Sequence, residues 1–524
     1  MNDSNNLTSN IPYPAPNAGA PRPRRIAVNT GYLLIAYVLE AAMGFVLLGI
    51  VARYLSQAGF GRYGYVISFI ELAIMITEFS NSRVLVREIA RDKAQAQAPL
   101  DGTWTLRLML SVLMVVVVII AGIATNADQE LWWAILFFAV GQVFFNLAEV
   151  FTAVYRGFQR MQYQAFIIIA AQVLTVALCL VAIYFDMGLM GLFAARLIAS
   201  FLRLVAAWYI SRRRFLAERL SRDWREMWFL LRESIPVGIN LVLRRFIWRG
   251  GIVLLTITLN ARLVGSGDLA AGLLYGPLRL VEQMRIVPAS LIGALLPVMS
   301  EQAQQNPARF SSTLYRSFKL FITLSLFLAN MITALAEPIT NLLLGSNLAE
   351  SAAVLGVFGW IIVLTFTNQY FEASLLAVGR QWIVAWGLGA GFAIGALASW
   401  LWLVPTYQAL GVPYGIMLAE GFVFCVSFVA MLSYFNRRQL LGMLARIGAA
   451  CLVTAGAFYV LRSTNVFLAA PLGTLVFLAA VLLFRVFDHN ELEAIVTMVT
   501  FHKRLRWIRR KLFKVDPQVG QVDA

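Results

Sequence analysis

The stretch WTLRLMLSVLMVVVVIIAGIAT, residues 104–125, carries a single charged side chain, Arg107. A helix of about 20 mainly apolar residues spans the hydrocarbon core of a bilayer, so this stretch has the length and polarity of a membrane span. Similar runs recur along the chain, in which 60% of the 524 residues are apolar and 13% are charged. Soluble proteins carry about a quarter charged residues. The sequence therefore predicts an all-α polytopic membrane protein.

Apolar segments of this kind predict about 14 transmembrane helices. They lie near 28–52, 61–81, 104–125, 130–155, 162–185, 188–210, 235–260, 271–296, 313–336, 351–377, 381–403, 410–434, 442–461 and 466–487. Because the number of spans is even, both termini are expected on the same side of the membrane.

Lysine and arginine indicate which side that is. Between the predicted spans, 31 of them fall on the side of the termini, and only Arg53, Arg62, Arg262 and Arg462 fall on the other side. Cytoplasmic loops of membrane proteins carry an excess of basic residues. The distribution therefore predicts that both termini are cytoplasmic.

The chain divides into six predicted regions. Residues 1–25 are polar and proline-rich and are expected to form a disordered cytoplasmic arm. Two six-helix lobes, 26–210 and 235–434, follow on either side of a basic cytoplasmic connector, 211–234. The glycine-marked turns near Gly157 and Gly379 match between these lobes, as expected for a transporter built from two repeats. Two further helices, 435–487, and a basic cytoplasmic tail, 488–524, complete the chain.

The residue inventory excludes several classes of function. The net charge of +16 is spread in short runs between apolar segments, which argues against nucleic acid binding. The histidines, His489 and His502, lie in the tail, and Cys179, Cys425 and Cys451 are far apart, so no metal site and no cofactor are predicted. The sequence has no P-loop and no large outer loop for a catalytic domain. It predicts a transporter and not an enzyme.

Three arginines interrupt the apolar segment 235–260. In LVLRRFIWRGGIVLL, residues 241–255, Arg245 and Arg249 lie four positions apart on one helical face, and Arg244 lies about 100° away. Each arginine at the centre of a span costs about 2.5–3.5 kcal/mol on insertion scales. These residues are therefore expected to bind a ligand or to be paired.

The next segment, 271–296, adds a polar stripe. Arg279, Glu282 and Arg285 recur every three residues, and three prolines interrupt the same segment. Glu282 is expected to pair with one or two of the arginines. Because five arginines in the two segments then face one carboxylate, a net positive charge is predicted at this position.

Two interpretations of these arginines remain open. In the first, they line a water-filled cavity that binds an anionic substrate, for which the planar guanidinium fork suits phosphate oxygens. In the second, they form a buried ion-pair network that holds the two segments together. The first interpretation is favoured because five arginines exceed what one carboxylate can pair.

Carboxylates elsewhere in the spans form a second group of candidates. Glu40, Glu71 and Glu78 lie in the first two predicted helices, and Glu372 lies in the tenth. Each is a candidate for carrying a proton or a cation, or for pairing with an arginine. Pairing is the favoured role.

The first two helices carry a recognisable pattern. Asn29 opens the first, ARYLS at 52–56 and FGRY at 60–63 form the turn between them, and REIAR at 87–91 follows the second. The pattern, together with YRGFQRMQYQA at 155–165, resembles that of bacterial polysaccharide flippases of the Wzx type. Ser56 departs from the glycine usual at its position in that family.

The resemblance implies the two-lobed fold of the multidrug/oligosaccharidyl-lipid/polysaccharide exporter superfamily. It also implies transport of undecaprenyl-diphosphate-linked oligosaccharide across a bacterial inner membrane, beside membrane lipids and polysaccharide polymerase and export machinery. The substrate-binding residues would be Arg245, Arg249, Arg279 and Arg285, with Arg244 beside them. The alternative is a cation-coupled drug antiporter of the same superfamily, which would need acidic groups at the binding centre.

Overall fold

The computed structural model describes residues 23–80, 82–124, 128–462, 465–488 and 491. These residues form helices joined by short turns, and the described part of the chain contains no strand. Hydrocarbon offers no hydrogen-bond partners to the backbone. A helix suits a membrane span because it pairs its own backbone N–H and C=O groups. The predicted all-α membrane class is confirmed. Almost all of the predicted arm, 1–25, and of the predicted tail, 488–524, lies outside the described residues.

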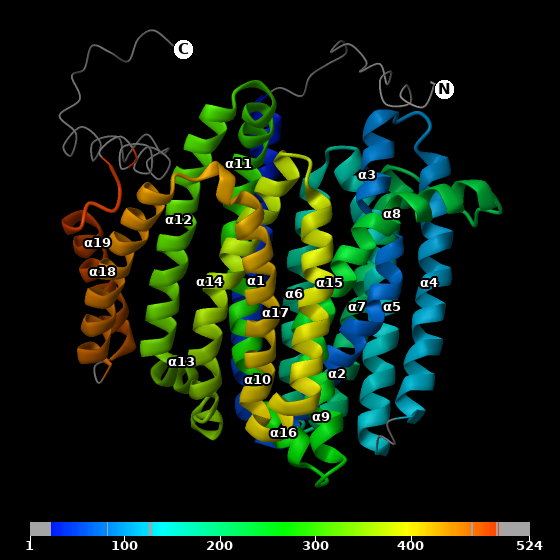
Figure 1. Ribbon diagram of the computed structural model, residues 1–524. Coiled ribbons are helices and arrows are strands. Elements are labelled where there is room, and N and C mark those ends of the chain that lie inside the picture. The colour runs from blue at the N-terminus through cyan, green and yellow to red at the C-terminus, as the bar shows by residue number, and fades with distance from the viewer. Residues whose placement is uncertain (1–22, 81, 125–127, 463–464, 489–490, 492–524) are drawn as a thin grey trace.

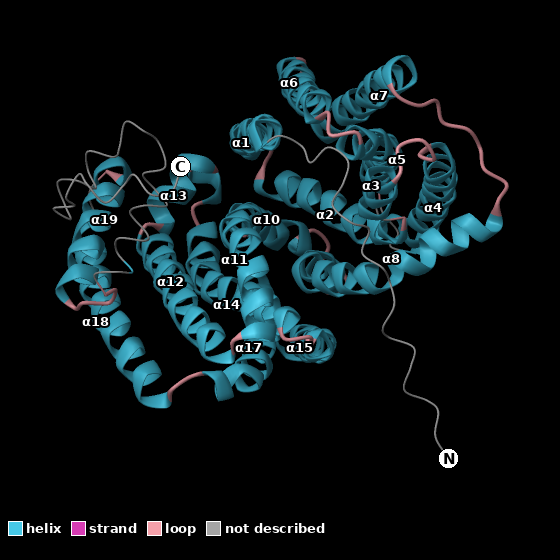
Figure 2. Cartoon of the chain, turned by 90° about the horizontal axis from the view of Figure 1, so that it is seen from above, coloured by secondary structure: helices cyan, strands magenta, loops and turns pink. Residues whose placement is uncertain are grey.

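The helices before residue 215 gather on one side of the molecule and are called the N-terminal lobe here (Figure 2). They are α1 (Pro23–Tyr54), α2 (Gln57–Ala73), the 3-10 helix η1 (Ile74–Phe79), α3 (Ser82–Arg91), α4 (Gln97–Ala124), α5 (Gln129–Gly157), α6 (Met161–Tyr184) and α7 (Gly188–Arg214). The chain of α2 continues through η1 toward α3. Two carboxylates of interest, Glu71 and Glu78, lie on α2 and η1.

The helices after residue 223 are called the C-terminal lobe here, and the first of them, α8, also packs against η1 and α4 of the N-terminal lobe. They are α8 (Trp224–Arg245), the π turn η2 (Phe246–Gly250), α9 (Gly251–Asn260), α10 (Ser266–Met284), α11 (Ile286–Gln305), α12 (Pro307–Ala334), α13 (Ala336–Leu343), α14 (Ser351–Ala377), α15 (Gln381–Ala398), α16 (Val404–Tyr407) and α17 (Gly411–Met431). Two further helices, α18 (Arg437–Leu461) and α19 (Val466–Leu483), stand at the outer edge of this lobe (Figures 1 and 2). The boundaries that the sequence predicts for the two lobes, 26–210 and 235–434, stay predictions.

Fewer spans are recognised in the structure than the sequence predicts. By length and composition, 11 helices of the described residues can cross a membrane, or up to 12 if the bent pair formed by α10 and α11 is one span. The pair α8 and α9 is not among them, and its apolar run is interrupted by arginines. The segment Gln381–Tyr434 counts once although it contains both α15 and α17, which pack closely at Gly391 and Ala419. The predicted number of 14 is therefore not confirmed.

The structure adds detail to two predicted segments in the middle of the chain. The connector predicted at 211–234 is helical from Trp224 onward, because α8 starts there and runs without a break into the arginine-bearing segment. The helix predicted at 271–296, which three prolines interrupt in the sequence, is broken in the structure. Pro288 lacks the N–H that would bond to Met284, where α10 ends, and segments 266–293 and 295–305 meet at 43° near Pro297.

Turns at matching places in the two lobes have the same geometry. The N–H groups of Arg160 and Arg380 each donate to the carbonyl five residues earlier, at 2.8 Å. The residue with left-handed backbone is Gln159 (φ 57°) in one turn and Gly379 (φ 74°) in the other. Aligned on these turns, Gln159 stands at the place of Gly379.

The lobes touch tightly at the end of the molecule that lies at the bottom of Figure 1, where α9 and α16 also lie. There, a Cβ atom at Gly61 of α2 would collide with the carbonyl oxygen of Asp268 at the start of α10. Arg62 donates to the carboxylate of Asp268 at 3.0 Å, and Arg53 donates to the carbonyl of Leu342 at 2.5 Å. We call this contact the lower seam. Since it joins α1 and α2 to α10 and α13, it holds the two lobes together at this end.

Candidate functional site

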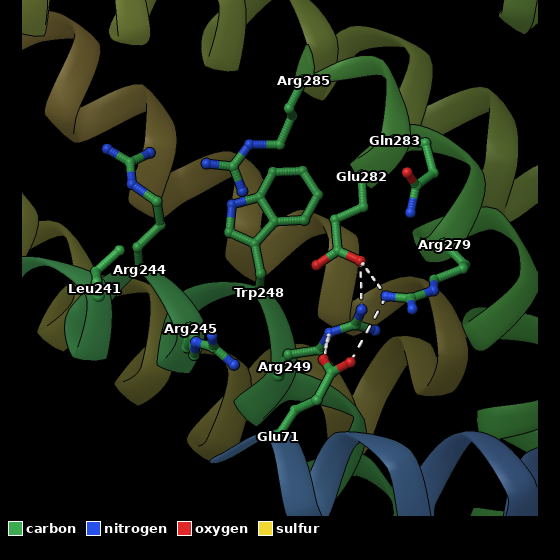
Figure 3. Close-up of a pocket in the computed structure, with 10 residues that line it drawn as sticks. All are labelled: Glu71, Leu241, Arg244, Arg245, Trp248, Arg249, Arg279, Glu282, Gln283 and Arg285. Atoms are coloured by element: carbon green, nitrogen blue, oxygen red, sulfur yellow. Dashed lines mark hydrogen bonds and ion pairs between the residues drawn. The ribbon is translucent and has the colours of Figure 1, made fainter. Parts of the chain in front are cut away.

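A cavity of about 300 Å³ lies between the two lobes (Figure 3). It is lined by Glu71, Leu241, Arg244, Arg245, Trp248, Arg249, Arg279, Glu282, Gln283 and Arg285. All five arginines predicted from the sequence are in this set. The structure therefore brings together residues from α2, α8, η2, α10 and the junction of α10 with α11.

The π turn η2 positions the centre of the cavity. It spans Phe246–Gly250, directly after α8, and both Trp248 and Arg249 lie within it and are buried. A π turn adds a residue to the helical turn and is often found at functional sites. Although this extra residue changes the helical register, Arg245 and Arg249 both still pair with carboxylates of the N-terminal lobe.

Arg249 is the most enclosed of the five, with 2% of the residue exposed. Its Nε lies 2.5 Å from Oε2 of Glu71, and its Nη2 pairs with Glu282. Arg279 joins the same cluster, because its Nη1 lies 3.1 Å from Glu282 and 3.6 Å from Glu71. Two arginines and two carboxylates thus form one four-membered ion-pair cluster at the base of the cavity.

Arg245 and Arg244 diverge in the way that their spacing predicts. Arg245 Nη2 lies 2.6 Å from Oε1 of Glu78, which belongs to η1 of the N-terminal lobe. Arg244 turns toward the C-terminal lobe and pairs with Glu372 of α14. The Arg245 side chain is 32% exposed and the Arg244 side chain 14% exposed, so the first is the more accessible of the two.

Arg285 has a different environment. Its guanidinium carbon lies 4.8 Å from the centre of the Trp248 ring, a cation–π arrangement. No carboxylate of the described residues lies within ion-pair distance of it, whereas the other four arginines each pair with at least one. Arg285 is therefore the arginine in this cavity whose charge is least compensated by contact.

The Trp248 ring is held in place from behind. Its Nε1–H donates to Oε1 of Glu420 at 3.0 Å, and Asn368 donates to Oε2 of the same carboxylate at 2.7 Å. All three residues are buried. Because both oxygens of Glu420 accept hydrogen bonds from the C-terminal lobe, the ring that supports Arg285 is fixed to that lobe.

The sequence-based picture of the site needs one main correction. Five arginines do not face one carboxylate, because Glu71, Glu78 and Glu372 come from distant segments and join Glu282. Glu40 is not among the lining residues. Elsewhere in the N-terminal lobe, Arg203 pairs with Glu149 at 2.6 Å. The net positive charge that the sequence predicts for the arginines of segments 235–260 and 271–296 is therefore too large.

Two contributors were not identified from the sequence. Trp248 immediately precedes Arg249 in the quoted stretch, and Glu420 is a carboxylate within the apolar segment 410–434. The criterion that selects Glu372, a charge inside a span, also selects Glu420. No sequence signal links Trp248 to Arg285, since their contact depends on how η2 packs against α10.

The arrangement is suited to binding an anion. Arginine presents a fixed fork of N–H donors that remains charged, and donors in a partly enclosed site interact strongly with phosphate or carboxylate oxygens. A volume of about 300 Å³ is at the small end of ligand sites. It suits a charged headgroup better than a whole lipid. Among the described residues, no group of three or more His, Cys, Asp or Glu side chains could hold a metal ion.

Comparison with known proteins places this arrangement in context. The profile of a family described as polysaccharide biosynthesis protein matches residues 26–303, which include most of α1, all of α2 to α10 and most of α11. A search of curated protein sequences finds no match.

Several solved membrane proteins share the fold. The lipid II flippase MurJ in an inward closed conformation superimposes with a TM-score of 0.67 at 12% identity, over 88% of this chain and 99% of that one. A multidrug resistance transporter of the MATE family, in an inward-facing conformation, gives 0.61 at 14% identity, over 78% and 98%. A transporter of the MOP superfamily from Pyrococcus furiosus, whose binding pocket is described as having reverse polarity, gives 0.52 at 15% identity, over 81% and 94%. At these identities, the likeness shows the fold.

Proposed function

Because the chain belongs to the polysaccharide biosynthesis protein family, we propose that it is a flippase for undecaprenyl-diphosphate-linked oligosaccharide. In this proposal it carries the lipid-linked repeat unit from the cytoplasmic to the periplasmic leaflet of a bacterial inner membrane. The product is then used by the polymerase and export machinery of a polysaccharide pathway. The chain acts by alternating access and not as an enzyme.

The observation that supports this proposal is the arginine-lined cavity between the lobes. A diphosphate headgroup is costly to bring into hydrocarbon because its charge loses water. Arg285 and Arg245 offer donors that replace this water, because the first has no carboxylate partner among the described residues and the second is partly exposed. The lipid tail can stay in the bilayer while only the headgroup crosses. A cavity of about 300 Å³ accommodates such a headgroup.

The orientation of the proposed cycle follows from the basic loops and the lower seam. If the termini are cytoplasmic, as the distribution of arginine predicts, the lower seam lies on the periplasmic side. The lobes are then closed toward the periplasm, and substrate enters from the cytoplasmic side. Transport requires the lower seam to open, which means that Arg62 and Asp268 must separate.

The alternative of a cation-coupled drug antiporter is less well supported. A cationic drug would have to compete with five arginines for the carboxylates that line the cavity or pair with those arginines. Like charges in a partly enclosed site repel strongly. Because these carboxylates are already paired, whereas Arg285 has no carboxylate of the described residues within ion-pair distance, the cavity favours an anionic substrate.

The test is a leaflet assay with the purified protein in proteoliposomes that contain a diphosphate-linked oligosaccharide. Arg285→Gln is the variant to compare, because Arg285 stacks on Trp248 and its removal leaves no carboxylate of the described residues without an ion-pair partner. We expect the rate of translocation to fall by at least tenfold, about 1.4 kcal/mol of lost anion stabilisation. Arg262→Gln, an exposed arginine in the turn before α10, is the matched control and should keep the wild-type rate.

Two results would contradict the proposal. Wild-type protein that is folded but moves no lipid-linked oligosaccharide is not a flippase for this class. If Arg285→Gln translocates the lipid at the wild-type rate, the arginine-lined cavity is not part of the transport pathway. A protein that instead exchanges a cationic dye for protons would support the antiporter.

A further inference from the structure

Two of the carboxylates that pair with the arginines come from the opposite lobe. Glu71 and Glu78 lie on α2 and η1 of the N-terminal lobe, whereas Arg249 and Arg245 lie in the C-terminal lobe. These pairs therefore cross the interface between the lobes. When the lobes move apart at this level, each pair must break.

Glu71 occupies the position that a phosphate would be expected to take. Its two oxygens face two guanidinium groups, with Oε2 at 2.5 Å from Arg249 Nε and Oε1 at 3.6 Å from Arg279 Nη1. Figure 3 shows this carboxylate reaching into the cluster from below. Carboxylate and phosphate oxygens use the same N–H donors of arginine. A bound phosphate and Glu71 would thus compete for the same donors.

The remaining carboxylates cannot be displaced in this way. Glu282 lies on the same helix as Arg279, three residues away. Glu372 and Glu420 lie on α14 and α17, which belong to the lobe that carries the arginines. These three side chains move together with the arginines. Only Glu71 and Glu78 can withdraw as a consequence of lobe movement.

The charge balance of the cavity supports the same division between carboxylates that can withdraw and carboxylates that cannot. The five arginines of the cavity are balanced by five carboxylates, namely Glu71, Glu78, Glu282, Glu372 and Glu420. Withdrawal of Glu71 and Glu78 leaves two positive charges uncompensated. A diphosphate joined to a lipid and a sugar carries about two negative charges, one on each phosphate. The diphosphate therefore has the charge that the two withdrawn carboxylates had.

From these observations, and on the basis of the flippase function proposed above, we infer that Glu71 and Glu78 are internal counter-ions of the arginines, which the diphosphate of the substrate replaces. Each holds an arginine in the empty cavity and is displaced when a diphosphate binds.

The exchange couples binding to movement of the lobes. Without substrate, separating the lobes at the cavity would leave Arg249 and Arg245 without their N-terminal partners in a poorly hydrated site, which is unfavourable. With a diphosphate present, its oxygens replace the lost partners, and the lobes can move. The two pairs thereby disfavour movement of the lobes in the empty protein, and a bound diphosphate removes that penalty.

The test measures binding of inorganic pyrophosphate to the full-length purified protein in detergent, by isothermal titration calorimetry. Glu71→Gln removes the charge of the competitor and keeps its size, so we expect pyrophosphate to bind about tenfold more tightly than to wild type. The reason is that apparent affinity is reduced by the fraction of protein whose site is occupied internally. Glu78→Gln should give a smaller increase, because Arg245 and Glu78 are more exposed than Arg249. Glu350→Gln, an exposed carboxylate before α14, is the control and should not change the affinity.

The outcomes separate this inference from the proposed function. Unchanged or weaker pyrophosphate binding by both Glu71→Gln and Glu78→Gln would overturn the exchange, even if wild-type protein flips its lipid normally. Tighter binding by these variants, in a protein that flips no lipid-linked oligosaccharide, would support the exchange and refute the proposed substrate. If Glu71→Gln does not fold, Glu78→Gln decides, because Arg249 is not involved in that pair.

Discussion

Removal of the Arg249 guanidinium should destabilise the protein more than removal of any neighbouring arginine. In Arg249→Met, the carboxylates of Glu71 and Glu282 lose the group that lies closest to both of them. Methionine has a similar length and packs well, so the loss of charge pairing dominates over the loss of volume.

The magnitude follows from the burial of the pair. Breaking a buried ion pair by removing one partner costs about 3–5 kcal/mol, because the other charge stays buried without compensation. Arg279 still contacts both carboxylates, which are about one-fifth exposed. We therefore expect a loss near the lower limit, about 3 kcal/mol. Arg245→Met breaks a pair whose partners are 32% and 24% exposed, for which about 1 kcal/mol or less is expected.

The measurement is the free energy of unfolding in mixed micelles, obtained from an SDS titration of each variant. Equal losses for Arg249→Met and Arg245→Met would show that burial does not separate the two pairs, and would refute this reasoning. The double variant Arg249→Met plus Glu71→Gln provides an internal check. It should regain about 1 kcal/mol relative to Arg249→Met, because one uncompensated carboxylate is removed.

Three further predictions concern the contacts between and within the lobes. Asp268→Asn should weaken the lower seam, because it removes the charge that pairs with Arg62. A cysteine introduced at Ala271, which is buried close to Asp268, should then react several times faster with a membrane-impermeant thiol reagent. An unchanged reaction rate would contradict the role of the Arg62–Asp268 pair. Gly61→Ala places a methyl group against the carbonyl of Asp268, and should lower the free energy of unfolding by about 1–3 kcal/mol, measured by the same SDS titration. Pro297→Ala restores an N–H donor and should reduce the 43° bend. The distance between a spin label at the start of α10 and one at the end of α11 should then increase, and lipid translocation should become slower.

Several features of the protein follow from the sequence because they depend on local composition. The free energy of transferring a residue into hydrocarbon depends largely on its own side chain. Apolar runs therefore identify membrane-spanning helices whatever the tertiary fold. The same reasoning singles out Arg244, Arg245 and Arg249, since a charge within a span needs a polar environment. Their division into two directions also follows from helical spacing. The fold class and the arginine-rich site were accessible in this way.

The partners of these arginines were not accessible from local composition. Glu71 reaches Arg249, and Glu372 reaches Arg244, only because α2 and α14 pack beside η2 and α8. Helical periodicity tells which side chains share a face, but it does not tell which helix lies opposite that face. The distinction between Arg249, which pairs with carboxylates, and Arg285, which stacks on Trp248, depends on the same packing. The sequence by itself determined that charge lies at mid-span, and the tertiary structure decided how that charge is compensated, because ion pairing depends on distances between segments far apart in the chain.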